Sequence, residues 1–120
     1  MAGKFVVSLT YAKNDLDKAT LAFVVGNAAA ASDKEAVVFL SSEAVQLAVK
    51  GYNQGLQEPG FAPLADLMAN FAKAGGKMYV CSPCFKKRSL DETALVDGAI
   101  IVGGAKLVEF MADGAPSISY

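Results

Sequence analysis

The two cysteines, Cys81 and Cys84, are the residues of this chain best suited to chemistry. They are the only cysteines among 120 residues, and the lack of histidine excludes serine–histidine catalysis. Cys81 follows a short β-favouring run at 77–80, and three cations occupy 86–88. Cations lower the pKa of a nearby thiol, and so do the N–H groups that open a helix. A nucleophilic or sulfur-carrying cysteine needs such a lowered pKa.

Three other interpretations of the cysteine pair stay open at the level of sequence. Free cysteine is among the most buried residue types, so both side chains could be core hydrophobes. A thioredoxin-like redox pair follows an early strand, whereas this pair lies two-thirds along the chain. Zinc would need two further ligands, from carboxylates or from other subunits. No metal and no other cofactor is expected.

Apolar runs and helical periodicity predict the elements that position the cysteines. The predicted strands lack polar alternation, as is typical of strands that are buried on both faces. The expected strands are 4–9, 36–40, 77–81, 99–102 and a short edge strand at 117–120, and the expected helices are 16–31, 42–49, 63–74, 90–96 and 105–111. This alternation predicts one three-layer α/β/α domain over residues 1–120, built on a parallel sheet.

Capping signals support several of these helix starts. They are Asn14 or Asp15, Ser41 or Ser42, and Ser89 with Glu92 three residues later. Ser82 and Pro83 are expected to cap and begin a helical turn directly after Cys81, which places Cys84 in its first turn.

The expected helix at 16–31 is apolar on two sides. Its side chains form one stripe and a second face: Leu16, Ala19, Phe23 and Ala30 on the first, and Leu21, Val24, Val25 and Ala28 on the second. A helix that is apolar on two sides must be buried on two sides. The sheet can cover one side, and another copy of the chain is the simplest cover for the other. Gly26 predicts close packing within this helix.

Composition narrows the classes of partner. The formal net charge is −1 and the pI is about 5.3, so no basic field favours nucleic acid or anionic lipid. No apolar run approaches the roughly 20 residues that span a bilayer, so no membrane partner is expected. No signal peptide is apparent, and two cysteines without an export signal favour reduced thiols. We expect a cytoplasmic protein.

Ligands of a parallel sheet bind beyond the carboxyl ends of its strands. One alternative function is therefore a non-catalytic, oligomeric small-ligand-binding protein, with a pocket lined by Thr10, Tyr11, the loop 51–60 and the cysteines. A thiol-redox sensor that uses Cys81 and Cys84 is a further alternative. The glycines 103–104 before a helix could receive a phosphate, but a tight strand-to-helix turn explains them better.

The chain resembles the DsrE/DsrF-like family of small sulfur-relay proteins, which includes the TusD-type subunits of the tRNA-thiolation relay. The resemblance covers essentially the whole chain. Its most telling segments are KGY at 50–52, PGFAPL at 59–64, GGKMYVC at 75–81 with Cys84, LVDGA at 95–99, GGA at 103–105 and SISY at 117–120.

The resemblance implies a three-layer α/β/α domain with a mainly parallel five-stranded sheet, and assembly into homo-oligomers such as trimers or hexamers. It also implies that Cys81, at the end of the third strand, carries a persulfide. Cys84 matches a second cysteine of some relatives, which could resolve that persulfide or be the carrier itself. The leading hypothesis is a sulfur-carrier or sulfurtransferase-like protein, with sulfur-donor and sulfur-acceptor proteins as partners.

Overall fold

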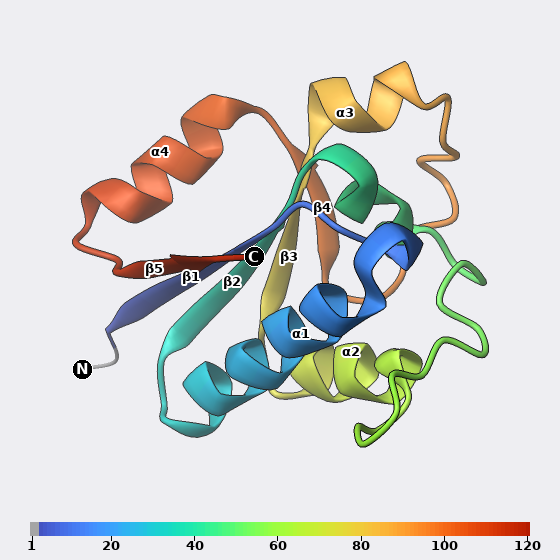
Figure 1. Ribbon diagram of the computed structural model, residues 1–120. Coiled ribbons are helices and arrows are strands. Elements are labelled where there is room, and N and C mark those ends of the chain that lie inside the picture. Colours follow the sequence, from blue (N-terminus) through green and yellow to red (C-terminus); the bar gives the residue numbers. More distant parts are fainter. Residues whose placement is uncertain (1–2) are drawn as a thin grey trace.

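The computed structural model describes residues 3–120 and contains one five-stranded sheet (Figure 1). All four strand pairings are parallel, in the order β4-β3-β2-β1-β5. The strands are β1 (Lys4–Leu9), β2 (Glu35–Leu40), β3 (Lys77–Cys81), β4 (Ala99–Val102) and β5 (Ser117–Ser119). The five-stranded parallel sheet expected from the resemblance is therefore confirmed, with β5 at the edge as predicted.

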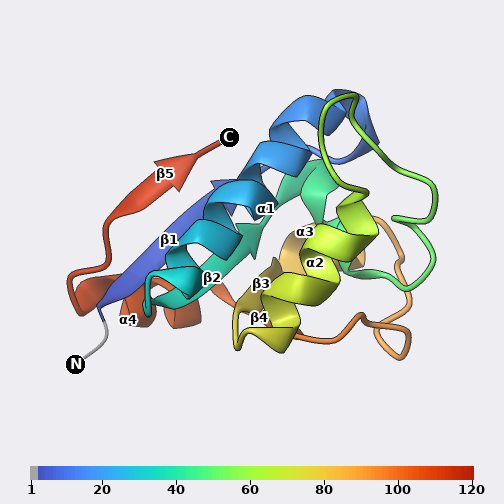
Figure 2. The same ribbon diagram turned by 90° about the horizontal axis from the view of Figure 1, so that it is seen from below.

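Helices cover both faces of the sheet, which makes the three layers that the sequence predicts. On one face lie α1 (Leu16–Ala31) and α2 (Leu64–Lys73), while α4 (Gly104–Ala112) lies on the other (Figure 2). A short helix, α3 (Ser82–Lys87), follows β3 directly. Two 3-10 helices, η1 (Lys13–Asp15) and η2 (Ser42–Ala48), follow β1 and β2. None of the helices of residues 3–120 is long and apolar enough to cross a membrane.

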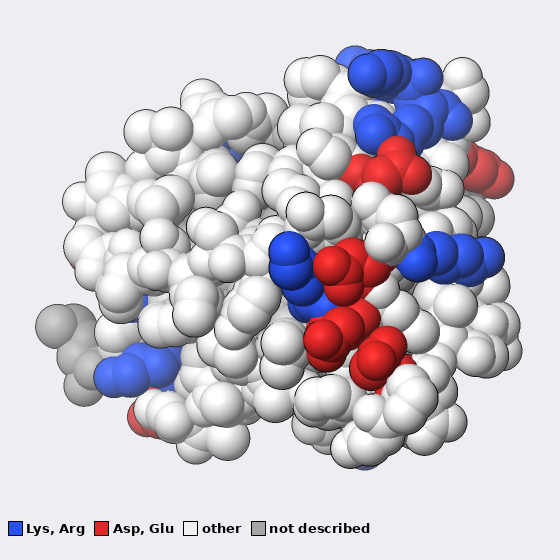
Figure 3. Space-filling view, viewed as in Figure 1, with Lys and Arg blue, Asp and Glu red and all other residues white. Residues whose placement is uncertain are grey.

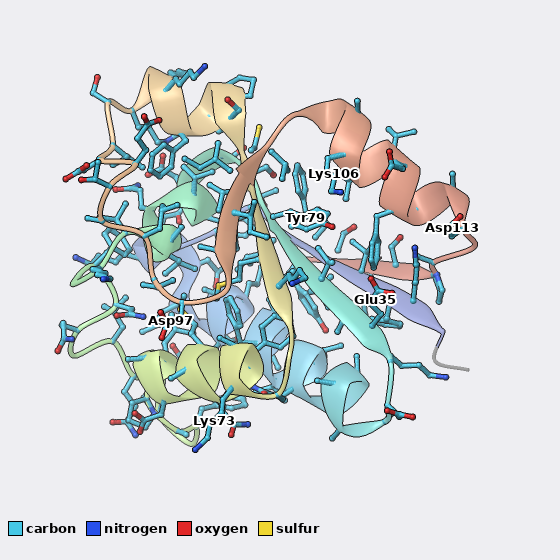
Figure 4. The ribbon with its side chains drawn as sticks, turned by 180° about the vertical axis from the view of Figure 1, so that it is seen from behind. Glu35, Lys73, Tyr79, Asp97, Lys106 and Asp113 are labelled. Atoms are coloured by element: carbon cyan, nitrogen blue, oxygen red, sulfur yellow. The ribbon has the colours of Figure 1, made fainter. Side chains whose placement is uncertain are left out.

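The strands divide the core into two clusters because successive side chains point to opposite faces. The larger cluster lies under α1 and α2, where the rings of Phe23 and Phe71 meet edge to face with centroids 5.9 Å apart. The smaller lies under α4, where Tyr79 meets Phe110 in the same way at 5.9 Å. Figure 4, seen from behind, shows Tyr79 between the sheet and α4.

Helix α1 has the predicted bounds, and Asp15 caps it by accepting a hydrogen bond from the Lys18 N–H. The close packing predicted at Gly26 is confirmed, since an added Cβ would lie 3.1 Å from Val38 and 3.3 Å from Phe71. The second apolar face of α1 is only half covered within one chain: Leu21, Val24 and Val25 are partly exposed and Ala28 is exposed. A second copy as its cover stays a prediction.

The prediction of a helix at 90–96 is wrong, because the structure has no helix there. Ser89 cannot begin a helix there, because it ends the turn after α3 in a left-handed conformation, with φ of 52°. The segment instead forms turns and a short antiparallel bridge, in which Val49 pairs with Leu95. Asp91 organises the first turn by accepting hydrogen bonds from the backbone N–H and the hydroxyl of Thr93.

The segment after β2 also differs in detail from its prediction. It forms the 3-10 helix η2, and Ser41 occupies the cap position without a side-chain hydrogen bond to the helix. Four of its seven residues are buried, so tertiary packing rather than capping holds it in place. This matters for function, because the first residue of η2 lies against the cysteine pair.

Candidate functional site at the carboxyl end of strand β3

The cysteines lie where β3 ends and α3 begins, as the sequence predicts. Cys81 is the last residue of β3 and stands at the N-cap position of α3, and Pro83 occupies its first turn. Ser82 is thus the first helical residue rather than the cap. Phe85 is 2% exposed and fixes this short helix to the larger core cluster.

The topology of the sheet brings η2 against the cysteine pair. In the pairing of β2 with β3, Leu40 lies opposite Val80, so the segments that follow the two strands leave the sheet side by side. The backbone N–H of Ser42 donates a hydrogen bond to the Cys84 Sγ at 3.3 Å. Ser42 adopts a left-handed backbone, with φ of 53°, which costs a non-glycine residue about 1–2 kcal/mol. Such strain clusters at functional sites.

The two thiols differ in their acidity. Burial opposes ionisation of Cys84, but the Ser42 N–H, a hydrogen bond from the Cys81 thiol and the charges of Arg88 and Lys87 hold its pKa below the usual value. Burial raises the pKa of Cys81, and its hydrogen bond to the Cys84 sulfur raises it further, against the lowering effect of the Cys84 N–H. Cys84 is therefore the more acidic of the two thiols.

The cations beyond the pair act unequally. Arg88 contributes most directly: its guanidinium donates to the Cys84 carbonyl at 3.2 Å and forms an ion pair with Glu43 at 2.8 Å. This ion pair joins α3 to η2 and so holds the Ser42 N–H beside the thiol. The charge of Lys87 also favours the Cys84 thiolate. Figure 3 shows Lys and Arg atoms gathered over the end of α3, with acidic atoms beside them.

Both cysteines are free thiols and both are partly exposed. They are thus neither fully buried core residues nor fully solvated ones, and a reagent or a partner thiol can reach them. Within residues 3–120, no group of three or more Cys, Asp or Glu side chains gathers closely enough to hold a metal ion.

A cavity of about 670 Å³ opens at the amino ends of β3 and β4, and Asn53 of the loop 51–60 is among its lining residues. Thr10, Tyr11 and the cysteines are not among its lining residues. Thr10 instead hydrogen-bonds the carbonyl of Tyr120 through its hydroxyl. At the carboxyl ends, α3 and η2 pack on each other, with Phe85 buried beneath them.

The other weak candidates have structural roles. Gly103 is the N-cap residue of α4 directly after β4, which confirms the tight strand-to-helix turn. Asp15 caps α1, and Asp91 organises a turn.

A sequence model of the DsrE/DsrF-like family matches residues 3–120. The chain belongs to the DsrE/DsrF-like family. Members of this family are generally associated with sulfur relay.

Two relatives of this DsrE/DsrF-like chain come from Methanocaldococcus jannaschii. The uncharacterized protein MJ0760 is 27% identical over 107 residues, which cover 89% of this chain but 38% of that protein. The chain thus spans well under half the length of that relative. The uncharacterized protein MJ0989 is 27% identical over 117 residues, which cover 98% of this chain and 99% of that protein.

Two solved structures share the fold of this DsrE/DsrF-like chain. The YchN protein from E. coli superposes with a TM-score of 0.68 at 16% identity, and covers 98% of this chain and 99% of its own. MTH1491 from Methanobacterium thermoautotrophicum, a protein of unknown function, gives the same TM-score and coverage at 13% identity. At such low identity these likenesses show the fold alone.

Sequence reasoning missed one functional group, the N–H of Ser42. It belongs to the backbone, and 42 residues separate it from the sulfur that it contacts. The only signal in the sequence was the serine pair 41–42, which suggested a helix cap and not a thiol contact.

Proposed function

We propose that this protein is a sulfur carrier, which accepts a sulfane sulfur and passes it on as a cysteine persulfide. The observation that carries the proposal is the pair of partly exposed thiols at the end of β3, one of which accepts the Ser42 N–H at 3.3 Å. Membership in the DsrE/DsrF-like family supports it. A thiolate is the form of cysteine that attacks a sulfane sulfur.

Cys84 performs the first step, because its pKa is the lower of the two. Its thiolate attacks the outer sulfur of a donor persulfide, R–S–SH. A bond forms between Cys84 Sγ and that sulfur while the donor S–S bond breaks, and the donor leaves as the thiolate RS⁻. The products are the Cys84 persulfide and the donor thiolate, so the step needs no external oxidant or reductant.

Cys81 performs the second step. Its sulfur attacks the outer sulfur of the Cys84 persulfide, the S–S bond to Cys84 breaks, and the Cys81 proton passes to the departing Cys84 sulfur. The persulfide then rests on Cys81, in agreement with the expectation from the sequence. If Cys81 attacks the inner sulfur instead, a Cys81–Cys84 disulfide forms and hydrogen sulfide leaves.

Intact-protein mass spectrometry after incubation with glutathione persulfide tests this scheme. Wild type is expected to gain one sulfur atom that a reductant removes. Cys84→Ser is expected to load slowly at neutral pH, while Cys81→Ser loads normally and retains the sulfur on Cys84. Loading of Cys84→Ser at the wild-type rate would assign the first attack to Cys81. A folded wild type that gains no sulfur would overturn the carrier function.

The pH dependence of alkylation tests the assignment of the thiolate separately. Iodoacetamide reacts with the thiolate, so each single variant reports the pKa of its remaining thiol. The rate for Cys81→Ser, which keeps Cys84, is expected to rise through a pKa below that of free cysteine. The rate for Cys84→Ser is expected to rise through a higher pKa. The reverse order would contradict the role of the Ser42 N–H.

A second candidate function, a thiol-redox sensor, is favoured by the position of the two partly exposed thiols three residues apart, where β3 ends and α3 begins. A mild oxidant would join Cys81 and Cys84 in a disulfide. Mass spectrometry would then find the loss of two hydrogens without added sulfur, and formation of that product in preference to the persulfide would favour the sensor.

The carrier is proposed to act as a homo-oligomer, a trimer or a hexamer, and to exchange sulfur with donor and acceptor proteins. The partly exposed face of α1 supports self-association, and so does Val108 on α4, which is 67% exposed. Light scattering coupled to size-exclusion chromatography measures the mass directly. A monomeric mass at working concentration would contradict the oligomer.

A further inference from the structure

The cavity at the amino ends of β3 and β4 is built like a binding site. It has a volume of about 670 Å³, within the range of roughly 300–1,000 Å³ that small-molecule pockets occupy. Its walls are α2, the start of the loop after η2 and the turn that leads into β4. Met78, at the start of β3, lies on its floor, three residues and so roughly 10 Å from Cys81. The cavity is therefore separate from the thiols.

Small and flexible side chains explain why this space is empty. Helix α2 turns three alanines toward it, Ala65, Ala69 and Ala72, and these are too short to reach the opposite wall. Met68 and Met78 are both buried and provide an apolar floor. Methionine is common at adaptable binding surfaces, because its side chain is flexible and polarisable.

One nearly buried polar side chain lines the cavity. Asn53 is 7% exposed and lines the cavity. Its amide donates to the thioether sulfur of Met68 at 3.3 Å, the one hydrogen bond that the side chain makes within residues 3–120. A thioether is a weak acceptor. A ligand that places an oxygen acceptor beside Asn53 would offer this amide a stronger hydrogen bond.

The rim of the cavity is positively charged. Lys50 and Lys73 line it together with one carboxylate, that of Asp97, and all three are exposed. None of the three forms an ion pair within the described chain. Figure 4 shows Asp97 on the turn before β4, beside α2, which carries Lys73. Two cations and one anion favour a ligand that carries negative charge.

We propose that this cavity binds a small amphipathic anion. The apolar body of the ligand lies on Met68 and Met78, a polar group meets the Asn53 amide, and a carboxylate, sulfonate or phosphate group lies between Lys50 and Lys73. The site is independent of the sulfur chemistry, since no thiol takes part in it.

A matched pair of fluorescent probes tests both halves of the proposal. The anionic probe is 8-anilinonaphthalene-1-sulfonate, and N-phenyl-1-naphthylamine has the same aromatic body without the sulfonate. Titration of the native protein is expected to give one saturable site per chain for the anionic probe. The neutral probe is expected to bind at least about fivefold more weakly, because it lacks the group that the lysines attract.

Two replacements of alanine by phenylalanine test where the probe binds. Ala69→Phe places a ring in the mouth of the cavity from an exposed helix position, and is expected to weaken binding of the anionic probe at least about tenfold. Ala105→Phe makes the same change at an exposed position on α4, across the sheet, and is expected to leave binding unchanged. Circular dichroism confirms that both variants fold.

Replacement of the two rim lysines tests the role of their positive charge. The double variant Lys50→Met, Lys73→Met is expected to abolish the preference for the anionic probe, and Lys106→Met on α4 is expected to preserve it. The proposal is overturned if wild type binds neither probe, if Ala69→Phe binds as wild type does, or if Ala105→Phe alone loses binding. Equal affinity for the two probes would overturn the anionic character of the ligand.

Discussion

Substitution of Gly76 by alanine is expected to destabilise the fold by about 2 kcal/mol through a single buried ring. A Cβ at this position would lie 2.6 Å or less from three carbons of the Phe71 ring, whereas an ordinary contact is 3.4–4 Å. The ring is fully buried and packs edge to face on Phe23, so it cannot rotate into solvent. Overpacking costs about 1–3 kcal/mol, and the lower chain entropy of alanine returns about 0.4–1 kcal/mol. Because the overlap is close to 1 Å, we place the cost near the upper end.

Urea unfolding followed by far-UV circular dichroism measures this loss, which corresponds to a fall in Tm of about 8 °C. Gly3→Ala is the matched control, since its Cβ would make only ordinary contacts of 3.7 Å with Lys34 and the stability of this variant should change by less than about 0.5 kcal/mol. Phe71→Leu lacks the three clashing ring carbons. A double-mutant cycle between Gly76→Ala and Phe71→Leu should therefore give a coupling of about 1 kcal/mol or more. Additive effects, or a Gly76→Ala protein as stable as the control, would refute the steric argument.

Three further predictions concern the site and its support. Arg88→Met should slow alkylation of Cys84 at neutral pH, because a cation that lowers the pKa of this thiol is lost. Lys86→Met is the control and should react at the wild-type rate. Equal slowing in both variants would contradict a specific role of Arg88. Asn27→Ala should lower the free energy of unfolding in urea by about 1–2 kcal/mol. The Asn27 amide joins the two helices, because it donates to the Phe23 carbonyl of α1 at 2.8 Å and to the Leu67 carbonyl of α2 at 3.0 Å. An unchanged unfolding midpoint would show that these bonds do not stabilise the fold. Phe85→Ala should cost about 3–5 kcal/mol in the same assay, and a loss below about 1 kcal/mol would mean that α3 does not depend on this anchor.

Much of the fold follows from local pattern. Strand β1 and helix α1 have the predicted bounds, because a short apolar run and a long alanine-rich stretch with an Asp15 cap each allow one structure. The end of β3 at Cys81 and the helical turn after it were also predicted correctly, since Pro83 favours the first turn of a helix. The helix expected at 90–96 failed for the opposite reason. Its capping pattern was local and weak, and pairing of Leu95 with Val49 prevailed.

By itself, the sequence determined that sulfur is the candidate atom for chemistry, that both thiols lie at the carboxyl end of the third strand, and that the domain has three α/β/α layers. The tertiary structure decided which thiol has the lower pKa. That choice depends on the N–H of Ser42, which the register of β2 against β3 brings to Cys84 from 42 residues away. It also decided where the cavity lies, because packing of α3 on η2 fills the carboxyl end of the sheet while the alanines of α2 leave the amino end open. The residue types set which thiols and cations the chain contains. The distances between segments that are far apart in the chain set the acidity of the thiols and the position of the cavity.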